Sequence, residues 1–163
     1  MALLTSLYLC SRTVYAAVGT PTGSGARVVA AAQTELPEGC LINGVITNEA
    51  DLTAALKEFF TANKLPMNRV ALIAGGSQFM HRILTLPAMS EKKRMAVLSH
   101  ELASGGAEVR APLDDYMLLS RDARTRVDTV LATRVEQSVI AGYNALAKAV
   151  GFKLYSIDLG LAA

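Results

Sequence analysis

The sequence predicts an α/β fold that carries an inserted α+β subdomain, and three observations support this. Segments with strand-like and helix-like apolar periodicity alternate along 163 residues with short connections. The chain begins with three strand-like segments in succession and closes with a helix and a strand, and we assign both ends to one core. Apolar residues make up 52% of the chain, which is enough for an ordinary packed core.

Composition narrows the class of protein further. The formal net charge of +2 is too small to indicate nucleic-acid binding. No run approaches the ~18 apolar residues of a membrane-spanning helix. Residues 1–15 lack the basic start of a signal peptide, so we interpret them as a strand. Cys10 and Cys40 stand far apart and outside any CxxC motif, which favours reduced thiols in a cytosolic protein.

The first strands form a predicted meander. Residues 4–10, 14–19 and 27–34 have strand-like patterns, and the segment 20–26 contains the Pro and Gly residues that turns need. The turn after residue 10 is short, so neighbouring strands are expected to lie side by side.

The stretch 36–102 organises the middle of the chain. A strand is predicted over 40–46 with a kink at Asn43-Gly44, and a helix begins near Asn48, which is a favourable N-cap. Residues one helical turn apart give this helix one apolar stripe: Leu52, Ala55, Leu56, Phe59 and Phe60. The apolar run 69–74 predicts a strand buried on both faces.

A second strand and helix follow. Residues 78–86 alternate, with Phe79, His81, Ile83 and Thr85 predicted on one face of the strand. Ser90 is expected to cap a helix that ends at Gly105-Gly106. The apolar seam of this helix is formed by Met95, Leu98 and Leu102.

The last third predicts two strands, a helix and a strand. The strands cover 114–120 and 126–133, the helix about 134–150, and the final strand 152–158. The helix has an apolar stripe of five residues: Val135, Val139, Tyr143, Leu146 and Val150. Its connection of two strands predicts a right-handed parallel crossover.

Catalytic and metal-binding motifs are all incomplete. His100-Glu101 would open an HExxH zinc motif, but Ser104 stands where the second His is needed. His81 is alone in a strand, and the glycine-rich turn 19–25 lacks the lysine and the following helix of a phosphate loop. Asp114-Asp115 have no third metal ligand at a suitable spacing. We therefore predict no enzyme activity and no metal site, and favour a binding role.

Basic residues concentrate in two places. One is Lys92-Lys93-Arg94, and the other is the set Arg121, Arg124, Arg126 and Arg134. Solvated surfaces explain both clusters, and contact with an acidic partner or an anionic lipid is the alternative.

Short motifs in a fixed order resemble the PilM family. The most specific are Pro37-Glu38-Gly39 followed by Asn43-Gly44-Val45-Ile46 and a helix, and the segment 82–87 (RILTLP) followed by Ser90-Glu91. PilM proteins are actin-like cytoplasmic proteins of type IV pilus assembly, related to the division actin FtsA and to the type II secretion L protein. The resemblance covers nearly the whole chain.

The resemblance implies an actin-like, ribonuclease-H-like half-domain with an inserted strand–helix–strand subdomain. Residues 1–36 and 126–163 would form the actin-like core, and residues 37–125 the inserted interaction subdomain. The second half of an actin-like fold would begin where this sequence ends.

The family's phosphate-binding loop is altered at its key positions. The family pattern Gly-Ile-Asp-Ile-Gly-Ser-Ser corresponds here to residues 6–12 (SLYLCSR). Tyr8 replaces the acid that would manage magnesium, and Cys10, before Ser11, replaces the glycine that lets backbone amides approach phosphate. We therefore expect no nucleotide cofactor and no ATP binding.

The resemblance favours a non-catalytic scaffold on the inner face of the cytoplasmic membrane. In the family, the N-terminal peptide of the bitopic membrane protein PilN docks near the inserted subdomain, and the scaffold is peripheral to the membrane through its partners. Residues chosen for exposure and charge are the predicted contacts: Phe79, His81, Arg82, Lys92, Lys93 and Arg94. Two alternatives stay open: an actin-like ATPase that is a fragment of a longer chain, and a self-associating, division-actin-like structural protein that forms homo-oligomers.

Overall fold

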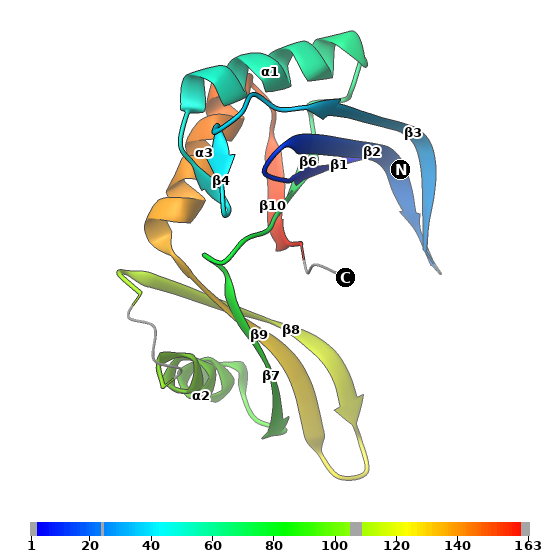
Figure 1. The fold of residues 1–163 in the computed structure, drawn as a ribbon. Helices are drawn as coiled ribbons and strands as arrows, with labels where there is room; N and C mark the ends of the chain where they lie inside the picture. The colour runs from blue at the N-terminus through cyan, green and yellow to red at the C-terminus, as the bar shows by residue number, and fades with distance from the viewer. Residues whose placement is uncertain (1–2, 24, 105–108, 161–163) are drawn as a thin grey trace. The chain divides into compact units, whose positions relative to one another are not determined.

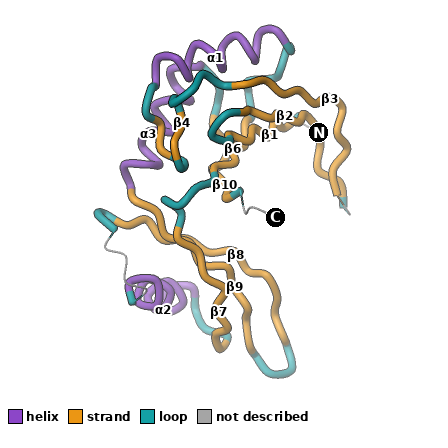
Figure 2. The backbone as a smooth tube through the Cα atoms, viewed as in Figure 1, coloured by secondary structure: helices purple, strands orange, loops and turns teal. Residues whose placement is uncertain are grey.

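The structure is a computed structural model that describes residues 3–23, 25–104 and 109–160. The chain divides into two compact units (Figures 1 and 2). Unit 1 runs up to Ser77 and resumes at Ala141, whereas unit 2 comprises Gln78–Ile140. The boundaries expected from the sequence, at residues 37 and 125, differ from these, because residues 37–77 lie in unit 1.

Unit 1 contains a five-stranded sheet in the order β10-β6-β1-β2-β3. Its strands are β1 (Leu4–Leu9), β2 (Thr13–Thr22), β3 (Gly25–Glu35), β6 (Val70–Ala74) and β10 (Leu154–Leu159). Strands β1, β2 and β3 form the predicted antiparallel meander, whereas β1, β6 and β10 run parallel. Strand β6 lies between β1 and β10, and four of its five residues are buried, which confirms the prediction from its apolar run.

Two helices supply the core beneath this sheet. α1 (Glu49–Ala62) begins at the predicted cap, where the Asn48 side chain accepts a hydrogen bond from the backbone N of Asp51 at 3.1 Å. α3 (Gln137–Val150) begins at Gln137 and not at 134, because the pairing of β9 with β8 continues to Glu136. The helices and strands share a core in which Phe60 stacks on Phe152, with ring centroids 5.6 Å apart.

The segment 40–46 is a hairpin and not the single kinked strand that was expected. β4 (Leu41–Ile42) pairs antiparallel with β5 (Val45–Ile46). The reason is the Asn43-Gly44 pair, in which both residues have positive φ, as a tight two-residue hairpin turn requires. The buried Tyr143 hydroxyl donates to the Gly44 carbonyl at 2.7 Å, and burial raises the pKa of Tyr143 to about 12, so it remains a neutral donor.

Unit 2 is a three-stranded antiparallel sheet in the order β7-β9-β8, with one helix. The elements are β7 (Met80–Pro87), α2 (Glu91–Ala103), β8 (Pro112–Asp122) and β9 (Val127–Glu136). The predicted alternation of β7 is confirmed, since half-buried and exposed residues alternate along it. The predicted parallel crossover is wrong. It would have joined β9 and β10 within one sheet, but β9 lies between β7 and β8 in unit 2, and α3 leads to β10 in the five-stranded sheet.

α2 packs on one face of this sheet. Leu98 and Leu102 of α2 form a buried cluster with Val130 and Ala132 of β9, and half-buried residues such as Met80 and Met95 surround it. α2 ends at Ala103, and the expected stop at Gly105-Gly106 lies outside the described residues. Among the described residues, no helix combines the length and hydrophobicity needed to span a membrane.

Candidate functional site

The carboxyl ends of the three parallel strands in unit 1 mark the first candidate site, because ligands of open α/β sheets bind there. Leu9, Ala74 and Leu159 pair side by side at this edge. The altered phosphate-loop positions Tyr8 and Cys10 lie at the same end of β1.

The ring of Tyr8 takes up space at this edge. A Cβ atom built on Gly160, just after β10, would lie 2.8 Å from Cε2 of Tyr8. Tyr8 also stacks on Tyr15 of β2, with centroids 6.3 Å apart and planes 26° apart. A hydrogen bond with the Cys10 side chain, its charge when ionised and partial burial raise the pKa of the Tyr8 hydroxyl. Tyr8 is therefore a neutral phenol at physiological pH and cannot replace a magnesium-binding carboxylate.

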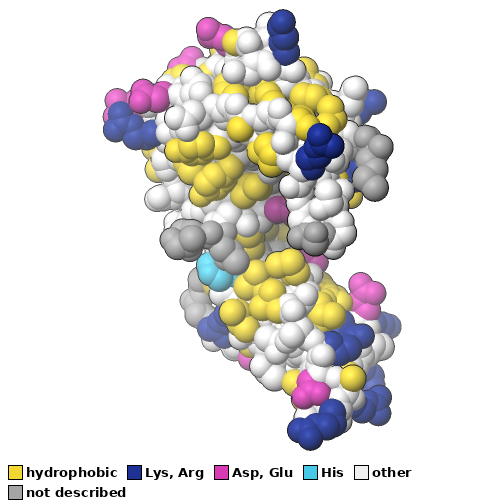
Figure 3. Space-filling model, turned by 90° about the vertical axis from the view of Figure 1, so that its right-hand side faces the viewer, with side chains coloured by type: hydrophobic (Ala, Val, Ile, Leu, Met, Phe, Trp, Pro, Cys, Tyr) yellow, Lys and Arg dark blue, Asp and Glu magenta, His cyan; other side chains and the backbone are white. Residues whose placement is uncertain are grey.

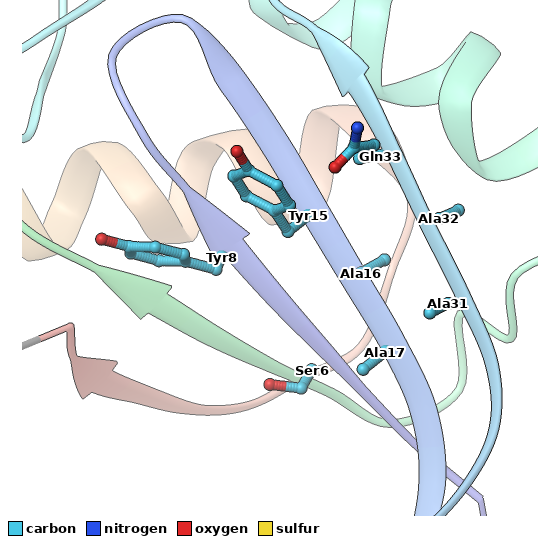
Figure 4. Close-up of a pocket in the computed structure, with 8 residues that line it drawn as sticks. All are labelled: Ser6, Tyr8, Tyr15, Ala16, Ala17, Ala31, Ala32 and Gln33. Carbon is cyan, nitrogen blue, oxygen red and sulfur yellow. The ribbon is translucent and has the colours of Figure 1, made fainter.

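A shallow cavity of about 540 Å³ lies on the sheet face opposite α1 and α3 (Figure 4). Its lining comes from β1, β2 and β3 and contains no charged side chain: Ser6, Tyr8, Tyr15, Ala16, Ala17, Ala31, Ala32 and Gln33. Nucleotide phosphates are held by basic side chains, convergent backbone amides or a metal. Among the described residues, no three His, Cys, Asp or Glu side chains are grouped to hold a metal ion.

The six predicted contact residues fall into three groups by exposure. His81 of β7 and Lys92 and Lys93 of α2 are exposed, as expected. Arg82 is half-buried, and its guanidinium donates to the Glu101 carbonyl at 3.2 Å. The remaining two residues, Phe79 and Arg94, are each only 7% exposed. The expectation that these two are exposed is therefore wrong.

Arg94 is buried because it lies in line with the apolar seam of α2. It precedes Leu98 by four residues and so shares its face of the helix. There its Nη2 donates to Oδ2 of the fully buried Asp128 at 2.5 Å, and its Nη1 donates to the Tyr116 hydroxyl at 2.9 Å. Arg121 binds the other Asp128 oxygen at 2.7 Å. The Arg121 hydrogen bond and both cations hold the pKa of Asp128 below its usual value.

A second ion pair holds the opposite end of α2. Arg134 of β9 donates to both carboxylate oxygens of Asp114 at 2.7 and 2.8 Å, and also to the Ser99 carbonyl of α2 at 2.9 Å. The hydrogen bond from Arg134 lowers the pKa of Asp114. Arg134 was predicted to belong to a solvated basic cluster, but it is buried and paired.

The other face of the unit 2 sheet is the candidate docking surface, and we call it the open face. Ile83 of β7 and Met117 of β8 both pair with Leu131 of β9, so the three form one apolar rung. Ile83 is 67% exposed and Met117 57%. The adjacent rung is polar, with His81 and Asp115 flanking Thr133. Sequence alternation placed His81 and Ile83 on one face, but Met117 was missed because the register of β8 against β9 is not readable from the sequence.

Comparison with known proteins was informative for structure alone. The structure titled "PilM-PilN type IV pilus biogenesis complex" is similar with a TM-score of 0.80, at 17% sequence identity, over 97% of this chain and 47% of that chain. This chain therefore spans about half the length of the chain that it matches. No family model matches the sequence, and neither does any curated protein.

Proposed function

From its PilM-like, actin-like half-domain fold, we propose that this protein is a non-catalytic cytoplasmic scaffold of a type IV pilus-like assembly machine. It binds the extended N-terminal peptide of a PilN-like membrane protein and lies at the inner face of the cytoplasmic membrane through that partner. The observation that carries the proposal is the apolar rung of the open face, in which the exposed Ile83 and Met117 flank the buried Leu131, on a protein whose structural neighbour is titled as a PilM-PilN complex.

The open face suits an extended peptide with alternating side chains. β7 is the outermost strand of its sheet among the described residues, so one of its edges is free to pair with an added strand. A peptide paired along β7 would place every second side chain beside Ile83 on the open face. Full burial of two such side chains contributes roughly 3–6 kcal/mol, and the main-chain hydrogen bonds fix the register.

The polar rung beside this surface would select among peptides. His81 and Asp115 lie on either side of Thr133 and offer one imidazole and one acceptor carboxylate. A peptide with apolar residues opposite Ile83 and a polar residue opposite His81 fits this pattern. A peptide with an unpaired charge opposite Ile83 does not, because that charge would lose its water without a partner.

The altered nucleotide edge supports the non-catalytic part of the proposal. The Tyr8 ring lies against Gly160, and the nearby cavity has a neutral lining. Calorimetric titration of the chain with Mg-ATP is expected to give no binding heat. A measurable, magnesium-dependent affinity would instead favour the actin-like nucleotide binder.

Self-association is a second candidate function, favoured by one observation. β3 is an edge strand of the five-stranded sheet in unit 1, and its residues Val28 and Val29 are each 58% exposed. Exposed apolar edge strands are templates for pairing between chains. Sedimentation at rising protein concentration distinguishes the two functions, since a peptide-binding scaffold stays monomeric and an assembling chain does not.

The proposed function is tested by capture of the chain on an immobilised N-terminal peptide of a PilN-like membrane protein. The expected result is retention of the wild-type chain and release by free peptide. A scrambled peptide of the same composition serves as the control. Equal retention on the scrambled peptide, or none on either, contradicts the proposal.

A further inference from the structure

We propose that one end of unit 2 binds the phosphate of an anionic phospholipid headgroup. This basic end comprises the first turn of α2, the segment 88–90 before it, and the β8–β9 turn. The site lies apart from the β7 edge, and the inference does not depend on peptide binding.

The fold brings two basic clusters together that are distant in the sequence. A cavity of about 440 Å³ lies between them, lined by Ala88, Met89, Ser90, Arg94, Arg121, Asp122, Ala123 and Arg126. Figure 3 shows Lys and Arg side chains gathered at the end of unit 2 where the β8–β9 turn lies. The three arginines outnumber Asp122 and the Asp128 carboxylate that Arg94 and Arg121 share, so the cavity has a net positive charge that suits a phosphate group.

The backbone holds the two sides of the cavity in place. The backbone N of Ala88 donates to the Arg126 carbonyl at 2.7 Å, which joins the segment before α2 to the hairpin turn. Asp122 Oδ1 accepts from the backbone N of Arg124 at 2.8 Å and of Thr125 at 3.1 Å. The turn is therefore shaped before any ligand arrives, which lowers the entropic cost of binding.

Hydrogen-bonding capacity remains in the cavity lining. Ser90 is the N-cap of the 13-residue α2, but its side chain makes no capping hydrogen bond, and the helix dipole favours an anion at this end. The Nε of Arg94 is buried without a hydrogen-bond partner, although its other nitrogens bind Asp128, Tyr116 and Met89. The side chain of Arg94 is only 8% exposed, so Arg94 contributes its charge to the cavity, and the Ser90 hydroxyl is the donor that a ligand can reach.

The charge around the cavity favours a lipid surface over a free phosphate. Lys92, Lys93 and Arg124 are exposed and belong to the same two segments without lining the cavity. A single small anion does not need these additional cations. A plane of neighbouring anionic headgroups does use them, because each basic residue near the surface strengthens binding of the chain to the membrane. Ala88, Met89 and Ala123 add small apolar contacts suited to the headgroup region, and the lining includes no aromatic ring for a nucleotide base.

Arg126 permits a test that spares the fold. Its φ of 56° is in the left-handed region, which glycine adopts without strain, so Arg126→Gly removes a cation and leaves the turn at least as stable. Lys64 is a matched control in unit 1, because it is exposed and has a φ of 52°. Lys64→Gly makes the same change in backbone freedom and in net charge.

The wild-type chain and both variants are sedimented with vesicles of phosphatidylcholine alone and of phosphatidylcholine mixed with phosphatidylglycerol. We expect wild type and Lys64→Gly to bind only the anionic vesicles, and Arg126→Gly to bind about fivefold more weakly. Salt is expected to reduce the wild-type binding.

Three results would overturn the proposal. One is the absence of binding to anionic vesicles while inorganic phosphate still binds in an Arg126-dependent way, which would assign the site to a free anion. Another is Arg126-dependent binding of polyglutamate without vesicle binding, which would assign it to an acidic protein segment. The third is an equal loss in Lys64→Gly and Arg126→Gly, which would show that only net charge matters.

Discussion

The ring of Tyr8 lies against Gly160, and a Cβ atom at residue 160 would come within 2.8 Å of Cε2 of Tyr8. This contact closes the edge of the sheet at which an actin-like fold would place its phosphates. The same Cβ atom would lie 3.2 Å from a methyl group of Ile73, so little space remains beside Gly160.

Gly160→Ala should destabilise the fold by about 1–3 kcal/mol, because the added methyl group overpacks against Tyr8. Tyr8→Ala in the same chain should remove most of this cost, which a double-mutant cycle of urea unfolding measures. If Gly160→Ala costs the same with and without Tyr8, the two residues are not in the contact described.

The ion pairs at either end of α2 should make stability depend on acid. A hydrogen bond from Arg134 lowers the pKa of Asp114 in the folded chain, and one from Arg121 lowers the pKa of Asp128. The pKa of an Asp side chain in an unfolded chain is about 3.9. Near these pKa values the folded chain therefore binds fewer protons than the unfolded chain. The stabilisation from the two ion pairs is present above about pH 4 and is lost as pH falls through the lowered pKa values. Urea unfolding at decreasing pH measures it.

Asp114→Asn provides the matched test of this acid dependence. The variant should lose about 1.5–3 kcal/mol at neutral pH, the range for hydrogen bonds to a charged group, and should lose less on acidification than wild type. Asp115→Asn is the control, because the Asp115 side chain is exposed and lies on the other face of the sheet. An unchanged acid response in Asp114→Asn would show that its pair with Arg134 does not contribute.

The cap of α1 gives an independent stability prediction. Asn48 accepts from the backbone N of Asp51 at 3.1 Å and donates to its carboxylate at 2.7 Å. Asn48→Ala should cost about 1 kcal/mol in urea unfolding. Asn48→Ser should cost less, since its hydroxyl keeps an acceptor and brings no second negative charge beside Asp51. Equal costs for the two substitutions would contradict the capping role.

Local patterns predicted most individual elements correctly. The apolar stripe of α1, the cap at Asn48 and the alternation of β7 all follow from short-range spacing, which the sequence displays directly. The hairpin at Asn43-Gly44 was also signalled, since Asn-Gly is typical of a two-residue turn. It was interpreted as a kink because each strand of the hairpin has only two residues.

Long-range pairing is what the sequence did not reveal. Arg94 is charged and was expected on the surface, but Asp128 lies 34 residues later and becomes its partner only when β9 packs under α2. The rung of Ile83, Leu131 and Met117 likewise depends on the register of three strands. Such pairings depend on tertiary structure, which the periodicity of apolar residues and secondary-structure propensity do not encode.

We propose that the open face of unit 2 holds an extended peptide. Calorimetric titration with the N-terminal peptide of a PilN-like membrane protein measures this binding. Ile83→Asp would place a charge in the contact, whereas Ile42→Asp changes an isoleucine that is 51% exposed in unit 1. We expect wild type and Ile42→Asp to bind alike and Ile83→Asp to bind at least tenfold more weakly, about 1.4 kcal/mol. Wild-type affinity in Ile83→Asp, or no binding by any of the three chains, would contradict the proposal.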